Sequence, residues 1–326
     1  MSDIIVGIDI GGTSTKFGLV DQSGEVLFQS KITTQTHSDF RDFIKELDDA
    51  IKKGMSEVGS STKLIGIGIG APNANYLRGT IEHAANLRWK GIIPIVDIMK
   101  NDFNVPVMIT NDANAAAMGE MIYGHAQVMK DFIVITLGTG LGSGIVCNGK
   151  LVHGHDGFAA ELGHVIINPR GRQCGCGRRG CLETYVSATG IKRTVYKMLA
   201  DHLEESELRG ISFHDLTTKM IAESAQRGDL VAKDAFEYTG QVLGAKLADT
   251  VAHTDPEAIF LFGGLSLAKD LIFEPTRRHL EETLMPIYRG KVQVLPSGLQ
   301  NQSAPILGAS SLVIDFLNNN EREVVG

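Results

Sequence analysis

Blocks of apolar residues along the chain alternate with short polar turns, and their spacing predicts both strands and helices. Near the N-terminus, apolar runs at 4–10, 17–20 and 26–32 are separated by turns rich in glycine, serine and threonine, which predicts a three-stranded meander. Over 40–58 the apolar residues recur at helical spacing, so we expect an amphipathic helix there.

The same alternation continues beyond this helix. The segment 63–72 is predicted to be a buried strand ending in a loop, and 92–103 a helix with a proline near its start. A further strand at 105–110 runs directly into an alanine-rich helix at 111–124. Residues 66–71 match the dinucleotide pattern G-x-G-x-x-A, but that pattern must open a helix, and Pro-Asn follows instead, so we reject it.

A second meander over 131–154 repeats the plan of residues 3–32, with an apolar strand, a Gly/Thr turn, a second strand and a tight Asn148-Gly149 turn. We interpret this as an internal duplication of architecture with low residue identity. The remaining elements are a mainly helical stretch, a buried strand ending in Gly-Gly, a helix, a strand and a last helix, at 183–254, 257–266, 267–284, 291–295 and 304–316.

Composition narrows the classes of protein. The chain has 326 residues, 43% hydrophobic and 21% charged, which is enough for two packed domains. It contains no run of about 18 apolar residues that could cross a membrane. The start, MSDIIVGIDIGG, lacks the pattern of a signal peptide, so we expect a cytoplasmic protein. The net charge of -7 argues against nucleic acid as a main partner.

Two glycine turns have compositions that favour phosphate binding. DIGGTSTK at 9–16 and TLGTGLGSG at 136–144 combine glycines, whose N–H groups can approach an anion, with serine and threonine hydroxyls. Asp9 could hold Mg²⁺ directly or through water, and Lys16 adds positive charge. One such turn often only makes a tight hairpin, but the pair favours a polyphosphate gripped by both halves of the chain.

Asn111 and Asp112 stand at a strand-to-helix junction. Both residue types are favoured helix N-caps, and capping alone would explain them. A carboxylate at such a junction can also accept a proton from a substrate hydroxyl, and capping does not exclude that role. The sequence leaves both interpretations open.

Three of the four cysteines lie within QCGCGRRGCLE at 173–183. A reducing cytoplasm disfavours disulfides, and Cys174 and Cys176 are too close to pair comfortably with each other. His164, ten residues before Cys174, completes one histidine and three cysteines, which is a closed tetrahedral zinc set. We therefore predict a structural zinc site made of His164, Cys174, Cys176 and Cys181. Zinc here would also fix the flanking carboxylates of Glu161 and Glu183.

These motifs resemble those of sugar kinases of the ROK family (repressors, open reading frames and kinases). The resemblance covers essentially the whole chain. It is carried by both phosphate motifs, the Asn-Asp pair at 111–112, ELGH at 161–164, CGCGRRGCLE at 174–183 and FGG at 262–264. The Cys-x-Cys-Gly-x2-Gly-Cys-x-Glu pattern is highly specific to this family.

The resemblance implies an α/β chain with a two-domain, actin-like (ribonuclease-H-like) ATPase fold and ATP in the cleft between the domains. We expect a smaller N-terminal α/β domain at 1–115, completed by a C-terminal helix at 304–317. A larger C-terminal α/β domain at 116–303 would carry the zinc loop. The resemblance further implies a homodimer that binds a sugar, ATP and Mg²⁺, with no membrane partner.

The resemblance also implies a role for each matched residue. Asp112 would be the base that takes the proton from the 6-hydroxyl of the sugar. The sugar hydroxyls would be held by Asn111, Asp112, Glu161, His164 and Glu183. The phosphates would be surrounded by Asp9, Gly12, Thr13, Lys16, Gly138, Thr139 and Gly140. Gly263 and Gly264 would approach the nucleoside.

One departure concerns the loop after the strand at 63–72. Many relatives have Gly-x-Pro-Gly there, whereas this chain has Gly-Ala-Pro-Asn, ending at Asn73. Asn73 could itself hydrogen-bond the sugar, and so could Asn86 in AANLRW. Asn75 and Tyr76 in the same loop are polar and not small, so we expect little room for an N-acetyl group.

The expected activity is therefore ATP-dependent phosphorylation of a hexose at the 6-hydroxyl, with glucose ahead of N-acetylmannosamine, fructose and allose. Two other classes of protein are alternatives to a sugar kinase. A sugar-sensing repressor would need a helix-turn-helix module before the first strand, which begins within the first five residues. A non-catalytic sugar-binding protein would be expected to lack the base or a phosphate motif, and all of them are present.

Overall fold

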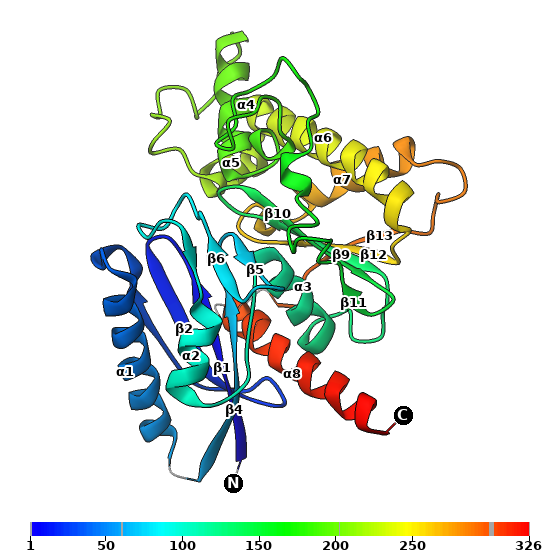
Figure 1. Cartoon of the computed structure of the whole chain (residues 1–326). Helices are drawn as coiled ribbons and strands as arrows, with labels where there is room; N and C mark the ends of the chain where they lie inside the picture. The colour runs from blue at the N-terminus through cyan, green and yellow to red at the C-terminus, as the bar shows by residue number, and fades with distance from the viewer. Residues whose placement is uncertain (1, 60, 202, 300–302, 326) are drawn as a thin grey trace. The chain divides into compact units, whose positions relative to one another are not determined.

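The computed structural model describes residues 2–59, 61–201, 203–299 and 303–325 of the chain. The chain divides into two compact α/β units (Figure 1). Unit 1 comprises Met1–Val128, Leu151–Ala159 and Gly298–Gly326, and unit 2 comprises Met129–Lys150 and Ala160–Ser297. Each unit contains a five-stranded sheet with helices packed against it.

The sheet of unit 1 has the strand order β3-β2-β1-β4-β8. Its strands are β1 (Ser2–Ile10), β2 (Ser14–Asp21), β3 (Val26–Thr33), β4 (Thr62–Gly70) and β8 (Val107–Thr110). β2 runs antiparallel to β1 and β3, whereas β1, β4 and β8 are parallel to one another. The first three strands form the meander predicted from the sequence.

Glycines in the central strands let a helix approach the sheet of unit 1. Helix α8 (Ala304–Val325) packs on β1 and β4 (Figure 1). A Cβ atom at Gly68 would lie 1.8 Å from the carbonyl oxygen of Ala309, and one at Gly7 would lie 2.2 Å from that of Ile306. Glycine is therefore required at both positions. The sequence predicts this helix only as far as 316, and the helix continues to Val325.

Among its described residues, unit 1 also contains three other α-helices and a small antiparallel sheet. The helices are α1 (Phe40–Val58), α2 (Ile95–Phe103) and α3 (Asp112–Tyr123), with a 3-10 turn, η1 (Thr34–Thr36). The sheet consists of β5 (Ala74–Asn75), β6 (Thr80–Glu82) and β7 (Ile92–Ile93). The helix predicted at 92–103 is too long, because Pro94 is the N-cap of α2 and the two residues before it pair with β6.

The sheet of unit 2 has the order β11-β10-β9-β12-β13. Its strands are β9 (Phe132–Leu137), β10 (Leu141–Cys147), β11 (Lys150–Leu151), β12 (Ala258–Phe262) and β13 (Gln293–Pro296). β9 and β10 are antiparallel, and β9, β12 and β13 are parallel. Both sheets place two parallel strands beside a three-strand meander, so the predicted duplication of architecture is confirmed.

Helices and short 3-10 turns make up most of the remainder of unit 2. They are η2 (Leu162–His164), η3 (Leu182–Thr184), α4 (Ala188–Asp201), α5 (Thr218–Arg227), α6 (Leu230–Thr254), η4 (Ser266–Ala268) and α7 (Asp270–Thr283). The predicted helix at 267–284 begins later than expected. Lys269 has φ 53° and ψ -130°, a conformation outside the helical region that separates η4 from α7.

The units divide the chain at other positions than the expected ranges 1–115 and 116–303. A boundary after residue 115 would fall inside α3, and unit 1 runs on to Val128. Unit 1 also takes in Leu151–Ala159, which the expected ranges assign to the other domain. Residues 1, 60, 202 and 300–302 of the expected domains lie outside the described residues.

Each unit has its own apolar core. Phe17 and Phe43 are fully buried in unit 1, and Ile259 and Leu243 are fully buried in unit 2. Within the part of the chain that the structure describes, no helix is both long enough and apolar enough to cross a lipid bilayer.

Candidate active site

In unit 1, several predicted site residues lie in one row across the sheet. Lys16 on β2 is the cross-strand partner of Asp9 on β1, and Asp9 is level with Gly70 on β4. Gly70 is level with Thr110, the last residue of β8, and Asp112 lies two positions further along the chain. The sheet therefore brings the first phosphate motif and the predicted base to one end of unit 1.

Both carboxylates of this row have raised pKa values. The pKa of Asp9 is raised from 3.8 to about 6, first by desolvation and then by the charge of Asp112, while Lys16 opposes the rise. The pKa of Asp112 is also raised, chiefly by desolvation, against a 2.9 Å hydrogen bond from the Ala113 amide. The Asp112 side chain is nevertheless exposed at the surface. It is accessible to a ligand and poorly solvated at once, and both properties suit a proton acceptor.

Asn111, rather than Asp112, caps helix α3. Its Oδ1 accepts a 2.7 Å hydrogen bond from the backbone N–H of Asn114, as an N-cap side chain does. Asp112 is the first residue of the helix, and its carboxylate accepts from the amide of the next residue. The capping interpretation of Asp112 is therefore unnecessary.

The turn between β1 and β2 brings predicted phosphate and sugar residues together. A Cβ atom at Gly12 would lie 2.6 Å from the backbone carbonyl oxygen of Asn86, so the two backbones are in close contact. The carbonyl of Thr13 accepts from the amide of Thr34 at 3.0 Å, which fixes the turn against η1. The side chains of Thr13 and Asn86 are both exposed.

Asn73 keeps the turn that relatives build with glycine. Its φ is 50°, in the left-handed region where asparagine is the residue best tolerated after glycine. Its Nδ2 donates to the carbonyl of Glu82 at 3.1 Å, and its carbonyl accepts from the Glu82 amide at 3.0 Å. The side chain is exposed, and its contact with a sugar stays a prediction.

The expectation that Asn75 and Tyr76 narrow the sugar site is not supported. Asn75 is fully buried, and its Nδ2 donates to the carbonyl of Asp156 at 2.8 Å. Tyr76 stacks on His153, with ring centroids 4.0 Å apart. Both side chains hold Leu151–Ala159 within unit 1, and the sequence gives no sign of this because the partner of Asn75 lies 81 positions away.

In unit 2, the second glycine turn links β9 to β10 at 138–140. The amide of its first glycine donates to the carbonyl of its last at 3.1 Å, and Thr139 lies at the exposed tip. The carbonyl of Leu137 accepts from the amide of Leu265 at 3.2 Å, so the turn at 263–264 lies beside it. The predicted phosphate and nucleoside residues of unit 2 are therefore neighbours.

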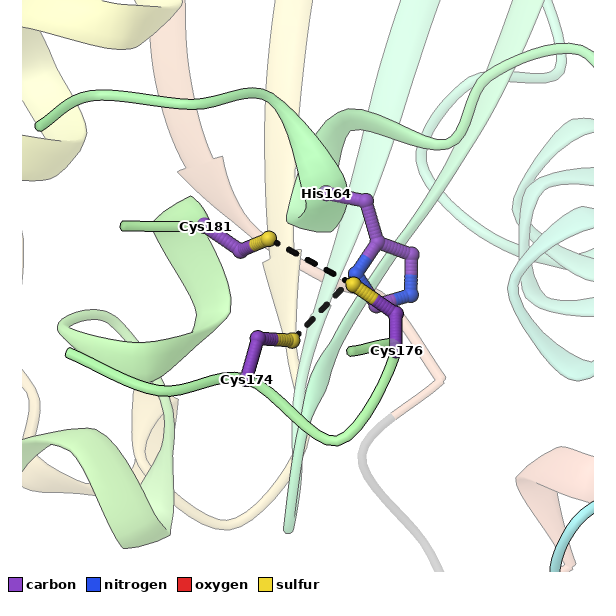
Figure 2. Close-up of side chains that lie close together, drawn as sticks. All are labelled: His164, Cys174, Cys176 and Cys181. Carbon is purple, nitrogen blue, oxygen red and sulfur yellow. Dashed lines mark hydrogen bonds between the residues drawn. The ribbon is translucent and has the colours of Figure 1, made fainter. Parts of the chain in front are cut away.

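The predicted zinc ligands converge in unit 2. Figure 2 shows the three sulfurs and the imidazole directed toward one another, and their ligand atoms all lie within 4.8 Å of each other. The Sγ atoms of Cys176 and Cys181 are 3.6 Å apart, and Cys174 Sγ lies 3.7 Å from His164 Nδ1. A Zn–S bond of about 2.3 Å places two sulfurs about 3.8 Å apart in a tetrahedron. The donor set and its dimensions fit zinc.

One thiol of this cluster has a lowered pKa, which favours the binding of a cation. Burial acts to raise the pKa of the Cys176 thiol, but hydrogen bonds from Arg178 outweigh it and bring the pKa down to about 6. Cys176 is exposed, whereas Cys174 and Cys181 are buried. A thiolate is therefore available at neutral pH on the exposed side.

The two predicted sugar carboxylates of unit 2 flank His164. Its Nδ1 faces the cysteines and lies 3.7 Å from Glu183 Oε1, whereas Nε2 faces Glu161 Oε2 at 3.9 Å. Glu161 is 55% exposed and Glu183 22% exposed, so both are open to a ligand. Cys174 Sγ donates to Glu183 Oε1 at 2.9 Å, which joins the cluster to this carboxylate.

Two residues that the sequence analysis does not single out shape the approach to Glu161. Ala160 has φ 66°, a strained conformation for alanine, directly before Glu161. Ser143 on β10 accepts from the amide of Leu162 at 3.2 Å, and its hydroxyl donates to the carbonyl of Ala160. No periodicity or motif marks Ser143, because its role depends on a contact 17 positions away.

Comparison with known proteins agrees with these motifs. The family model described as "ROK family" matches residues 5–316. A glucokinase of Halalkalibacterium halodurans is 35% identical over 97% of this chain and 97% of that relative. A xylose repressor of Caldicellulosiruptor bescii is 31% identical over 95% of this chain and 78% of that relative. The crystal structure of a ROK family glucokinase from Streptomyces griseus, in complex with glucose and AMPPNP, is 34% identical with a TM-score of 0.77, and the match covers 96% of this chain and 99% of that one.

The duplicated sheets, each with a glycine turn after its first strand, define the two-domain, actin-like ATPase fold that these solved relatives share. The family match spans nearly the whole chain, and the relatives are similar along their length. The chain belongs to the ROK family.

Proposed function

We propose that this protein transfers the terminal phosphate of ATP to the 6-hydroxyl of glucose. The main support for this proposal is the row of residues in unit 1 that runs from Lys16 through Asp9 toward Asp112. Asp112 is an exposed carboxylate with a raised pKa. Glucokinase relatives at 35% identity, and the bound glucose and AMPPNP of the Streptomyces griseus structure, support this choice of substrates.

Asp112 is proposed to accept the proton of the sugar 6-hydroxyl while the hydroxyl oxygen attacks the terminal phosphorus of ATP. Desolvation raises its pKa, and a more basic carboxylate takes a hydroxyl proton more readily than an ordinary aspartate. The hydrogen bond from the Ala113 amide, 2.9 Å long, fixes one carboxylate oxygen and orients the group. Asn111 is tied to the start of α3 and gives the base a rigid neighbour.

The phosphates are proposed to lie on the backbone of both glycine turns, with charge supplied by Lys16. Gly12, Thr13 and Asp9 would contribute from unit 1, and the turn at 138–140 from unit 2. Mg²⁺, when bound, would neutralise phosphate charge, and Asp9 is the residue proposed to hold it directly or through water. Gly263 and Gly264 are the proposed nucleoside contacts.

The sugar hydroxyls are proposed to bind the side chains of Glu161, His164 and Glu183 in unit 2. Each carboxylate can accept from two neighbouring hydroxyls, which suits a sugar with hydroxyl groups on adjacent ring carbons. From unit 1, the proposed contacts are Asn73, Asn86, Asn111 and Asp112.

Structural zinc is proposed to be held by the cluster of one histidine and three cysteines, which would fix both carboxylates beside it. Zinc thiolates require reduced cysteines, so we propose the cytoplasm as the compartment. The homodimer stays part of the proposal and rests on the family resemblance.

The testing experiment is an ADP-release assay with ATP and Mg²⁺ over glucose, mannose, fructose, N-acetylglucosamine and N-acetylmannosamine. We expect the kcat/KM of glucose to exceed the others by about 10-fold or more, since a site built for hydroxyls leaves groups unpaired with the wrong sugar. If N-acetylmannosamine comes first, the glucose assignment is wrong and the kinase assignment stands. If no sugar stimulates ADP release, the kinase assignment itself is wrong.

A further inference from the structure

In unit 2, the glycine turn at 138–140 touches both the segment proposed to hold the sugar and the segment proposed to hold the nucleoside. We propose that this turn couples the two binding events, and that the contact between Gly140 and Glu183 carries the coupling. Nucleotide binding would then strengthen sugar binding within a single unit. The inference rests on the proposed function.

The Glu183 carboxylate lies directly on Gly140. A Cβ atom added at Gly140 would lie 2.6 Å from Glu183 Oε2 and 3.8 Å from its Cδ. A contact of 2.6 Å is too short for any real side chain. Glycine at this position is therefore what allows the carboxylate to rest on the turn.

A backbone bond joins the same two segments. The amide of Ala188, at the start of α4, donates to the carbonyl of Gly138 at 2.8 Å. The hydroxyl of Ser187 donates to the carbonyl of Glu183 at 2.7 Å, so the residues between Glu183 and α4 form a short, tied segment. The turn and this segment must move together or break these bonds.

The other side of the turn is joined to the nucleoside segment. The carbonyl of Leu137 accepts from the Leu265 amide at 3.2 Å, and it would lie 2.8 Å from a Cβ atom at Gly263. Phe262 is level with Thr136 in the parallel pair of β12 and β9. The turn is therefore held between the two proposed ligand segments.

These contacts predict mutual stabilisation. Phosphate bound by the N–H groups of the turn would restrict the backbone on which Glu183 rests, and so restrict Glu183 itself. A carboxylate already held in place loses less freedom when it accepts sugar hydroxyls. Because coupling between two binding events is reciprocal, glucose must strengthen nucleotide binding by the same factor.

The test compares Gly140→Ala with Cys147→Ala, an alanine substitution on β10 outside the proposed binding residues. Gly140 does not adopt a positive φ, so the backbone there can accept an alanine. The glucose Kd is measured by calorimetry on the full-length protein, without nucleotide and with saturating AMPPNP and Mg²⁺. Thermal unfolding and zinc content are recorded for each sample.

We expect AMPPNP to tighten glucose binding by the native protein by about 5-fold or more, the lower end of typical coupling. Gly140→Ala should weaken glucose binding without nucleotide by about 10-fold and lose the coupling, because the new methyl group displaces Glu183. Cys147→Ala should keep the native glucose Kd in the absence of nucleotide and the native response to AMPPNP. Equal glucose affinity in the two variants, or native protein with no coupling, overturns the inference.

If Gly140→Ala does not fold, Glu183→Asp withdraws the carboxylate from the turn without adding an atom. Its glucose affinity should no longer respond to AMPPNP. A response of native size contradicts the inference. A native protein that phosphorylates glucose but shows no coupling refutes this inference alone, whereas one that neither binds nor phosphorylates glucose refutes the proposed function.

Discussion

At the scale of single residues, Asp112 combines surface exposure with a raised pKa. Asp112→Asn keeps the shape of the side chain and removes the proton acceptor. We expect kcat to fall by about 100-fold or more, the usual scale for loss of a general base. The fold should be unaffected, because Asn111 supplies the helix cap.

The measurement is steady-state kinetics with glucose, ATP and Mg²⁺, with a thermal melt of the same sample. An unchanged melting temperature with the lower kcat supports the role of base. Turnover near the native rate in the variant would show that the carboxylate takes no part in the chemistry.

Asp9 should make stability depend on pH in a defined direction. Its pKa is about 6 in the folded protein, whereas the ordinary value of 3.8 applies to the unfolded chain, so the folded form binds the proton more tightly. The favourable contribution of the proton is complete below pH 3.8 and is lost as pH rises through 6. From pH 5 to pH 8 the free energy of unfolding of the native protein should therefore fall by about 1–2 kcal/mol more than that of Asp9→Asn.

Urea unfolding of both proteins at pH 5 and pH 8, without Mg²⁺, measures this difference. The variant should gain stability relative to the native protein as pH rises. A difference between the two proteins that does not change with pH would mean that Asp9 has an ordinary pKa.

Residue identity alone predicts which side chains could act in catalysis or binding. It does not predict which of them are buried and hydrogen-bonded to other parts of the protein. Asp9, Asp112 and Glu183 are recognisable from their motifs. Asn75 is of an equally suitable residue type, yet it is fully buried and bonded to Asp156, which the sequence cannot reveal. Asn73, in contrast, is explained locally, because a φ of 50° is adopted most readily by glycine and asparagine.

At the scale of elements, the zinc loop yields the sharpest prediction. Purified protein should contain about one zinc per chain, since the donor set is closed and tetrahedral. Cys176→Ala should lose the metal, lower the melting temperature and weaken glucose binding, because Glu161 and Glu183 lose a fixed neighbour. Metal analysis, thermal melts and calorimetry check the three effects.

Cys147→Ala is the matched control, since Cys147 lies on β10 and outside the cluster. It should retain zinc and native glucose affinity. Native glucose affinity in a zinc-free Cys176→Ala protein would contradict the proposed link between zinc and the sugar carboxylates.

Elements follow from the sequence where periodicity decides them. Helix α1 occupies 40–58 as predicted, because its apolar stripe and the Asp39 cap agree. Errors arise where a single backbone feature overrides the pattern. Pro94 delays the start of α2, and Lys269, with φ 53°, delays α7.

At the scale of the whole molecule, the duplication of the sheet is readable from two meanders, but the assignment of segments to units is not. Leu151–Ala159 joins unit 1 through the side chains of Asn75 and Tyr76, far away in the chain. The end of unit 1 at Val128 follows from helix α3 remaining whole. Both depend on tertiary contacts that leave no local signature.

The central claim is that the chain transfers phosphate from ATP to the 6-hydroxyl of glucose with Asp112 as base. The most direct measurement is ³¹P NMR of a reaction of glucose, ATP and Mg²⁺ with native protein and with Asp112→Asn. We expect a glucose 6-phosphate signal that grows with native protein and about 100-fold more slowly with the variant. Phosphate on another hydroxyl, free phosphate in place of a sugar phosphate, or equal rates for the two proteins would contradict it.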